Sequence, residues 1–219
     1  GASQADVALL MVPASVGGFE ASIQKGDHKT GQVQGQTRQH ARLLKLLGVE
    51  QLIVGINKMD DPSVKYSEER YDEIKKEISG MLTKIGFKMD RVPVIPLSGF
   101  KGENLVDKSD KMPWYKGFKV QISKKETVKG HSLYDALNDV AKPPKRRTEE
   151  AFRMPVSGVY KIRGVGEVIC GCVEQGTLKP DTKVKFIPSG ATGKAFTIEM
   201  HHKTQSQAQC GDNVGVNIK

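Results

Sequence analysis

The sequence contains few cysteines and no long apolar segment. Its 3 cysteines, Cys170, Cys172 and Cys210, are an odd number and form no Cys-x-x-Cys pair, so neither a disulfide framework nor a zinc site is supported. No apolar run approaches the ~20 residues of a membrane-spanning helix, and residues 1–20 lack the basic segment, apolar core and cleavage site of a secretion signal. These absences favour a protein of the reducing cytoplasm with no membrane partner.

Basic residues outnumber acidic residues. The 219 residues include 34 Lys and Arg against 25 Asp and Glu, which gives a formal net charge of +9. Such a balance favours a polyanionic partner, and nucleic acid before an anionic membrane. A generally basic cytosolic protein is the alternative. The length allows one large domain or two small ones, each with its own core.

The segment Gln51–Asp60 joins an apolar run to a polar end. Its sequence, Gln-Leu-Ile-Val-Gly-Ile-Asn-Lys-Met-Asp, is typical of a buried strand followed by a polar loop. In an open α/β sheet, ligands bind just beyond the carboxyl ends of the strands. We therefore expect Asn57, Lys58 and Asp60 to lie at a binding crevice.

These three side chains suit the guanine base. An ionised Asp60 accepts two parallel N–H donors, which guanine offers through N1–H and its 2-amino group and adenine does not. A buried carboxylate left unpaired is costly, so this contact discriminates strongly. Asn57 could cover the N7 and O6 edge or tie neighbouring loops together, and the stem of Lys58 could lie on the base. The alternative is a solvated turn.

A second loop supports the same interpretation. Val92–Leu97 is another short apolar run, and it leads into Ser98-Gly99-Phe100. A Ser-Gly pair just after a strand can present backbone N–H groups to the guanine O6. The sequence therefore predicts two base-reading loops, separated by one helix.

A phosphate-binding loop is missing. A guanine nucleotide domain should begin with a strand, a Gly-rich phosphate loop and a helix, so we expect the chain to be a fragment without catalytic residues. Residues 188–195 imitate such a loop, but Pro188 replaces the first Gly and Ala195 replaces the Ser or Thr that would bind magnesium. We predict a hairpin turn there, because a phosphate loop must run into a helix.

The two loops resemble those of the translational GTPases. Residues 57–60 resemble the fourth guanine-nucleotide motif of that class, and residues 98–100 resemble the fifth, with Phe100 in place of the usual Trp. The chain is similar over nearly all its length to the elongation factor 1-alpha family, in particular at Gly35–Arg42, Leu47–Val49, Met112–Gly117 and Val159–Ile162. Gln32–Gln36 and Gly171–Gly176 resemble the elongation-factor-like paralogue.

The resemblance implies a set of ligands and contacts. The ligands are GTP or GDP and Mg²⁺, whose protein ligands would lie in the missing N-terminal part. The partners are aminoacyl-tRNA, the ribosome and a guanine nucleotide exchange factor. The guanine-binding residues that it implies are Asn57, Lys58, Met59, Asp60, Ser98, Gly99 and Phe100.

The C-terminal part has the alternation of short strands. Gly-containing turns separate five candidate strands, which favours a small β-barrel: residues 156–162, 167–173, 182–187, 195–200 and 213–218. By the resemblance, Glu199 and His201 match positions that pack on the terminal adenosine of aminoacyl-tRNA, and Asn213 matches one near the amino acid. His202 stands where bacterial relatives carry Arg, so its role stays open. No Cys or carboxylate stands near the two His at ligand spacing, so zinc is not supported.

The expected fold is the C-terminal part of a P-loop GTPase, with a doubly wound, mostly parallel sheet, followed by an all-β barrel. We expect the first domain at residues 1–142, a linker at 143–155 and an incomplete barrel at 156–219. Further expectations are a strand at 7–12, a surface loop at 16–35, helices at 37–47, 67–84 and 132–140, and an irregular insertion at 102–127. Within these segments Trp114 is expected to pack and His40 to be structural or exposed.

The leading functional hypothesis is a GTP-dependent carrier that brings aminoacyl-tRNA to the ribosome. A translation termination or ribosome-rescue GTPase on the same scaffold is one alternative. A non-enzymatic module that binds RNA or the cytoskeleton is another. The basic run Lys145–Arg147 is expected to be solvated, with contact to RNA phosphates as its alternative.

Overall fold

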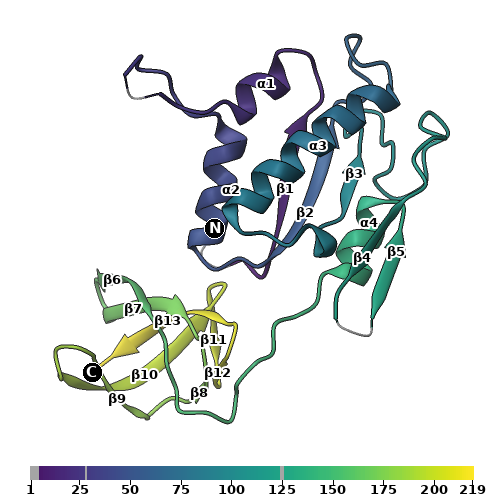
Figure 1. The fold of residues 1–219 in the computed structure, drawn as a ribbon. Coiled ribbons are helices and arrows are strands. Elements are labelled where there is room, and N and C mark those ends of the chain that lie inside the picture. Colours follow the sequence, from purple (N-terminus) through teal and green to yellow (C-terminus); the bar gives the residue numbers. More distant parts are fainter. Residues whose placement is uncertain (1–4, 28, 124–125) are drawn as a thin grey trace. The chain divides into compact units, whose positions relative to one another are not determined.

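The computed structural model describes residues 5–27, 29–123 and 126–219. The chain divides into two compact units, Gly1–Pro143 and Pro144–Lys219, and each has a separate apolar core. The first unit combines helices with a parallel sheet, and the second consists of antiparallel strands (Figure 1). This is the fold class that the sequence predicts.

A parallel sheet forms the centre of the first unit. Its strands are β1 (Val7–Pro13), β2 (Gln51–Asn57) and β3 (Val94–Pro96), in the order β1-β2-β3. The register pairs Pro13 with Asn57 and Ile56 with Pro96. Residues 52–56 of the middle strand β2 are apolar and buried, because both faces of the strand are covered. Since the strands are parallel and end level with one another, the loops that follow β2 and β3 emerge at the same edge.

Two long helices accompany the sheet: α2 (Gln36–Leu46) and α3 (Glu68–Ile85). In Figure 1, α3 runs across the sheet. Its buried stripe recurs every three or four residues, and it consists of Tyr71, Ile74, Ile78, Met81 and Leu82. Ser67 caps its start, and Gly86, at φ +107°, ends it. The predicted strand at 7–12 and the helices at 37–47 and 67–84 are confirmed.

The surface loop expected at 16–35 is partly wrong, because it contains the short helix α1 (Gly18–Ile23). The side chain of Phe19 is buried in the core. Glu20 accepts a hydrogen bond from the N–H of Gly17 (2.7 Å) and pairs with Arg70 of α3 (2.9 Å). The burial of Phe19 and the ion pair with Arg70, which is distant in the sequence, stabilise a helix too short to show a sequence period. Residue 28 of this segment lies outside the described residues.

The irregular insertion expected at 102–127 is also partly wrong. It includes β4 (Phe118–Gln121), which pairs with β5 (Thr127–Gly130) in an antiparallel hairpin. Phe118 and Val120 alternate with exposed neighbours and enter the core. Residues 124–125 of the insertion lie outside the described residues. A short 3-10 turn, η2 (Met89–Arg91), precedes β3.

The helix predicted at 132–140 is present as α4 (Leu133–Asp135) followed by the π-helical turn η3 (Ala136–Val140). Ser132 and Asp135 cap it reciprocally: Ser132 Oγ accepts from the N–H of Asp135, and the Asp135 carboxylate accepts from the N–H of Ser132. Its buried residues are Ala136 and Val140, whereas Leu137 is 45% exposed.

The second unit is an antiparallel, barrel-like arrangement of strands. The main sheet has the order β11-β10-β13-β7-β6, with β9 also paired to β10, and β8 pairs with β12. The bounds are β6 (Val156–Ile162), β7 (Gly166–Cys172), β8 (Thr177–Leu178), β9 (Lys183–Lys185), β10 (Thr192–Met200), β11 (Lys203–Gln205), β12 (Ala208–Gln209) and β13 (Asn213–Ile218). The five predicted strands are present. The sequence did not reveal β8, β11 and β12, which have only two or three residues each.

Residues 188–191 lie in the connection between β9 and β10, which pair antiparallel, and residues 192–195 begin β10. No helix follows, so the hairpin prediction is confirmed. Cys170 and Cys172 stand two residues apart on β7, so they share a face, and both are half-buried.

Candidate guanine-binding site

The loops that follow β2 and β3 contact each other directly at the carboxyl edge of the sheet. Ser98 Oγ donates to Asp60 Oδ1 (2.6 Å), and the N–H of Gly99 donates to Asn57 Oδ1 (2.9 Å). The N–H of Met59 donates to the carbonyl of Leu97 (3.1 Å). Three hydrogen bonds therefore join two segments that are about 40 residues apart in the chain.

The loop after β2 alternates between buried and accessible side chains. Met59 is fully buried in the core, while Lys58 is exposed and Asp60 is half-buried. Lys58 has φ +65°, a left-handed conformation that is uncommon outside glycine. Because the Met59 side chain is buried in the core, the loop is fixed there. Lys58 and Asp60 are therefore held at the edge of the sheet, where a ligand can reach them.

A hydrogen bond fixes the carboxylate of Asp60 but leaves part of its acceptor capacity unused. Ser98 is fully buried, and its Oγ donates to Asp60 Oδ1 while accepting from the N–H of Lys101 (3.1 Å). Among the described residues, none donates to Asp60 Oδ2. An ionised carboxylate has about four lone-pair positions, so Asp60 keeps capacity for two further donors.

The backbone N–H groups of the second loop are used differently from the sequence expectation. The N–H of Ser98 donates to the carbonyl of Glu103 (3.2 Å), and that of Gly99 to Asn57. The N–H of Phe100 has no acceptor among the described residues, and the Phe100 side chain is 86% exposed. Of the two functions considered for Asn57, the structure shows it tying the loops together.

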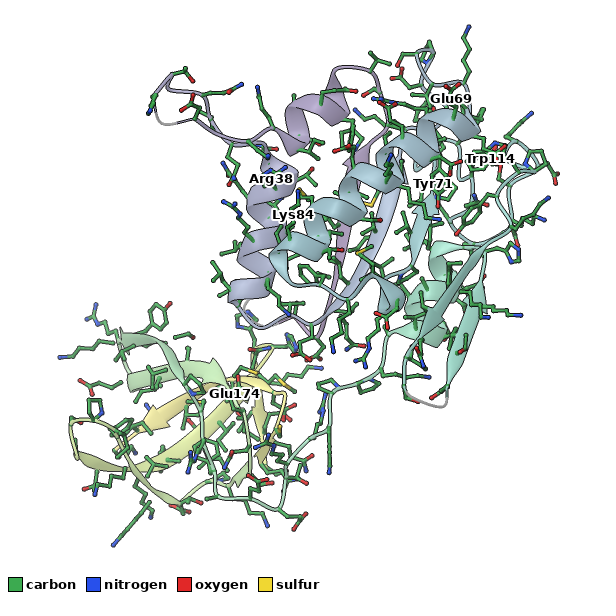
Figure 2. All side chains as sticks on the ribbon, viewed as in Figure 1. Arg38, Glu69, Tyr71, Lys84, Trp114 and Glu174 are labelled. Atoms are coloured by element: carbon green, nitrogen blue, oxygen red, sulfur yellow. The ribbon has the colours of Figure 1, made fainter. Side chains whose placement is uncertain are left out.

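Two hydrogen bonds that the sequence did not reveal stabilise the loop that follows β2. The N–H of Tyr66 donates to the carbonyl of Met59 (2.8 Å), and the indole Nε1 of Trp114 donates to the carbonyl of Tyr66 (2.9 Å). Trp114 lies beside Tyr71 at the same end of α3, with ring centroids 5.2 Å apart (Figure 2). The packing role expected of Trp114 is confirmed. No sequence spacing could have linked Tyr66 to Met59.

The four residues considered for tRNA binding gather at one end of the second unit's sheet. Glu199 lies opposite Gly215 in the β10–β13 pair, so Asn213, two residues earlier on β13, lies toward the hairpin at the end of β10. His201 and His202 form the two-residue turn of that hairpin, with φ +51° and +61°. All four side chains are exposed. Left-handed conformations at two His residues are strained, and such strain is concentrated at functional sites.

Other candidates carry no comparable arrangement. His40 is exposed on α2, which is one of the two situations that the sequence predicts for it. Within residues 5–27, 29–123 and 126–219, no three or more His, Cys, Asp or Glu side chains are grouped so as to hold a metal ion. No helix in this part of the chain combines the length and apolar composition of a membrane span.

Comparison with known proteins identifies the class. Residues 1–143 match the family model of the elongation factor Tu GTP binding domain, and residues 166–219 match that of elongation factor Tu domain 2. The chain therefore has the domains of a translational GTPase. It is 47% identical over all 219 residues to elongation factor 1-alpha of Plasmodium falciparum (isolate K1 / Thailand). The chain belongs to the elongation factor Tu and elongation factor 1-alpha family.

Solved structures agree with this assignment. Sup35 complexed with GDP is 32% identical, with a TM-score of 0.52 over 99% of this chain and 48% of that one. Sup35 complexed with GMPPNP gives 32% identity and a TM-score of 0.51 over the same shares. Elongation factor SelB of Methanococcus maripaludis, at 20% identity, a TM-score of 0.62 and coverage of 100% and 38%, is similar in fold. The chain spans 44% of the Plasmodium relative's length.

Proposed function

We propose that this protein is a translation elongation factor that carries aminoacyl-tRNA to the ribosome in a GTP-dependent manner, in the cytoplasm. Its guanine-binding residues are Asn57, Lys58, Met59, Asp60, Ser98, Gly99 and Phe100. The observation that carries this proposal is the Ser98–Asp60 hydrogen bond of 2.6 Å, which holds a carboxylate with spare acceptor capacity at the edge of the sheet. The similarity to Sup35, solved with GDP and with GMPPNP, supports the same ligand class.

The functional groups of these residues determine the role proposed for each in binding the guanine base. Asp60 accepts guanine N1–H and the 2-amino group, and the aliphatic stem of Lys58 covers a face of the base. Asn57 fixes the second loop through Gly99, and the N–H of Phe100 is available for the guanine O6. An adenine base leaves Asp60 unpaired in a half-buried position, and this is the source of discrimination.

The phosphates and Mg²⁺ are not assigned to these residues. Mg²⁺ prefers oxygen ligands and, when bound, neutralises phosphate charge. The described residues contain no group of three or more His, Cys, Asp or Glu side chains that could hold it, and the sequence has no Gly-x-x-x-x-Gly-Lys-Ser/Thr loop. We therefore assign no hydrolytic step to this chain, and expect residues 1–219 alone to show no GTP turnover. An exchange factor would act on the nucleotide-bound protein.

In the second unit, Glu199, His201, His202 and Asn213 are the residues proposed to hold the aminoacylated end of tRNA. A carboxylate can accept from a ribose hydroxyl, and an imidazole can stack on an adenine. The full-length gene product loaded with GTP should bind charged tRNA more tightly than uncharged tRNA. Equal affinity in a filter-binding assay would favour a termination or rescue role and contradict the carrier role.

The guanine site is tested by changing one carboxylate. Asp60→Asn in the full-length gene product replaces an acceptor by a donor, so GDP affinity should fall at least about a hundredfold, or about 3 kcal/mol. Xanthosine diphosphate, whose 2-carbonyl accepts, should bind better to the variant than to the unmodified protein. Isothermal titration measures both affinities.

The matched control is Asp61→Asn, which changes the adjacent carboxylate, equally half-buried, that accepts hydrogen bonds from Ser63. It should leave GDP affinity within about twofold. Unchanged nucleotide preference in Asp60→Asn would refute the assignment of Asp60. The domain limits 1–142, 143–155 and 156–219 are part of the same proposal.

A further inference from the structure

Three lysines lie in one row across the second unit's sheet. Lys183 of β9 is directly opposite Lys194 of β10. On the other side, Lys194 exchanges both backbone hydrogen bonds with Lys219, which follows β13 (2.7 and 3.0 Å). Directly opposite residues share a face, with Cβ atoms about 5 Å apart. All three side chains are exposed, so they form one cationic row, called here the lysine row.

The lysine row has little compensating charge. Lys194 Nζ pairs with Asp181 Oδ1 (2.7 Å), and among the described residues no other acidic side chain forms an ion pair with the row. Lys185, opposite Thr192, extends the positive charge along β9. Like charges directly opposite each other destabilise a sheet. Lysines on an edge strand such as β9 discourage edge-to-edge association, but β10 is an interior strand, so this does not explain Lys194 or Lys219.

An aromatic ring lies within the same patch. Phe196, two residues beyond Lys194, is 45% exposed, and the Nζ of Lys219 is 3.2 Å from its ring centroid. An exposed aromatic side chain flanked by cations on a sheet is the arrangement that binds single-stranded nucleic acid, because the phosphates meet the ammonium groups and a base can stack on the ring. An anionic membrane or an acidic peptide requires no such ring.

From this arrangement we propose that the lysine row and Phe196 form a second RNA-binding surface, which takes the phosphodiester backbone of a single-stranded RNA segment. It is distinct from the residues proposed for the aminoacyl end. Those lie at the His201 hairpin, and Lys194 stands at the opposite end of β10, about 23 Å away along the strand. The surface does not depend on the guanine site or on an aminoacyl group.

The experiment measures binding of a fluorescent oligouridylate of about 20 nucleotides to the full-length gene product, by anisotropy over a range of salt concentrations. The triple variant Lys183→Gln, Lys194→Gln, Lys219→Gln should lower the affinity about tenfold or more. It should also reduce the slope of log affinity against log salt by about 2, the change expected for three lost phosphate contacts on a single strand. Phe196→Ala should lower affinity with little change in that slope.

Two controls separate binding from folding and from net charge. Lys76→Gln, Lys84→Gln, Lys88→Gln removes the same charge from exposed positions in the first unit and should have a much smaller effect. The corresponding triple Lys→Arg variant should retain affinity, and the melting temperature of the glutamine variant should not fall, because the like-charge row is relieved. Because the probe carries no amino acid, a negative result here leaves the carrier proposal intact.

Unchanged affinity and slope in the glutamine triple variant would overturn the proposal. So would an equal loss in the first-unit control. Loss of binding to phosphatidylcholine and phosphatidylserine vesicles without loss of RNA binding would also overturn it, since that result identifies a membrane surface.

Discussion

At the scale of single residues, Ser98 controls where the Asp60 carboxylate lies. Its hydroxyl donates to Asp60 and accepts from the N–H of Lys101, and the side chain is fully buried. The proposed guanine recognition thus depends on a residue that need not touch the base. The geometry places Ser98 in the role of fixing one acceptor while leaving the other oxygen for the ligand.

Replacing Ser98 by Ala tests this dependence. The change removes one donor and leaves the Lys101 N–H without its acceptor, so GDP affinity should fall about tenfold, or about 1.4 kcal/mol. Isothermal titration of the full-length gene product measures it. The control Ser63→Ala removes a hydroxyl that serves Asp61 and Val16 in the neighbouring loop, and it should change GDP affinity by no more than about twofold. Wild-type affinity in Ser98→Ala would show that Asp60 needs no support.

The Asp135 carboxylate makes the stability of the fold depend on pH. The backbone N–H of His131 donates to its carboxylate, which lowers the pKa of that group below the ordinary value, and the N–H and hydroxyl of Ser132 act in the same direction. A lowered pKa in the folded state means that the ionised form stabilises the fold. That stability is fully present above about pH 4, the ordinary pKa of Asp, and is lost as the pH falls through the folded-state pKa.

Asp135→Asn should therefore lower the melting temperature at neutral pH, and the difference from the unmodified chain should shrink below about pH 4. Thermal unfolding followed by circular dichroism across this range measures the effect. Asp139→Asn, at an exposed position on η3, serves as the control. A difference that stays constant down to the lowest pH would contradict the assigned role.

At the scale of elements, helix α3 lies between the two loops proposed to read the base, with one glycine inside it and another directly after it. Gly86 ends the helix at φ +107°, where a side chain is strained. Gly80 lies inside the helix, and a Cβ built there meets nothing within 4 Å. The same substitution should thus have opposite effects at the two sites.

Gly86→Ala should destabilise the first unit by about 1 kcal/mol, whereas Gly80→Ala should stabilise it by about 0.5–1 kcal/mol. Chemical denaturation followed by circular dichroism measures both changes. Each variant controls for the other, because the added methyl group is identical. Destabilisation of equal size at both positions would contradict the reading of Gly86 as a conformational requirement.

The sequence predicted the elements that have a long or uniform pattern. β2 is a continuous apolar run, and α3 repeats its apolar residues over 18 positions, so both were evident from local sequence. The six-residue α1 and the two- or three-residue strands β8, β11 and β12 were not. Their stability comes from contacts such as Arg70 with Glu20, which depend on the folded chain.

Some contacts of the candidate site could be predicted from the sequence and others could not. Asn57, Asp60 and Ser98 were predicted because polar residues directly after two parallel strands must meet at one edge of the sheet. The pairing of the Ser98 N–H with Glu103, and the support of Met59 by Tyr66, were not. Both depend on backbone conformation, including the left-handed Tyr66 at φ +58°, for which the side chain gives no signal.

At the scale of the whole molecule, the two units have separate cores, and an exposed basic segment lies at their boundary. Lys145, Arg146 and Arg147 are exposed, while the Arg147 carbonyl accepts from the N–H of Gly176 in the second unit. The backbone before Arg147 is therefore the part of this segment least fixed by hydrogen bonds to the core. Exposed segments of this kind are preferred sites of proteolysis.

Limited trypsin digestion should cut after Lys145 or Arg146 and leave the second unit as a stable product, identified by mass spectrometry. The variant Lys145→Gln, Arg146→Gln, Arg147→Gln should resist that cut at the same enzyme concentration. Degradation of the second unit at a rate equal to that of the cut would show that its core does not hold without the first unit.

Trp114 gives residues 1–219 an intrinsic fluorescence signal from a single indole. The sequence contains 1 tryptophan, and its indole is joined through two hydrogen bonds to the backbone of Met59, which lies between the two residues proposed to flank the base. Within residues 1–219, ultraviolet emission excited at the red edge of protein absorption thus originates from a single indole, which is linked to the loop proposed to hold the base. We expect a change in this emission when nucleotide binds at the proposed site, so binding can be followed in real time without a dye, a tag or a modified nucleotide.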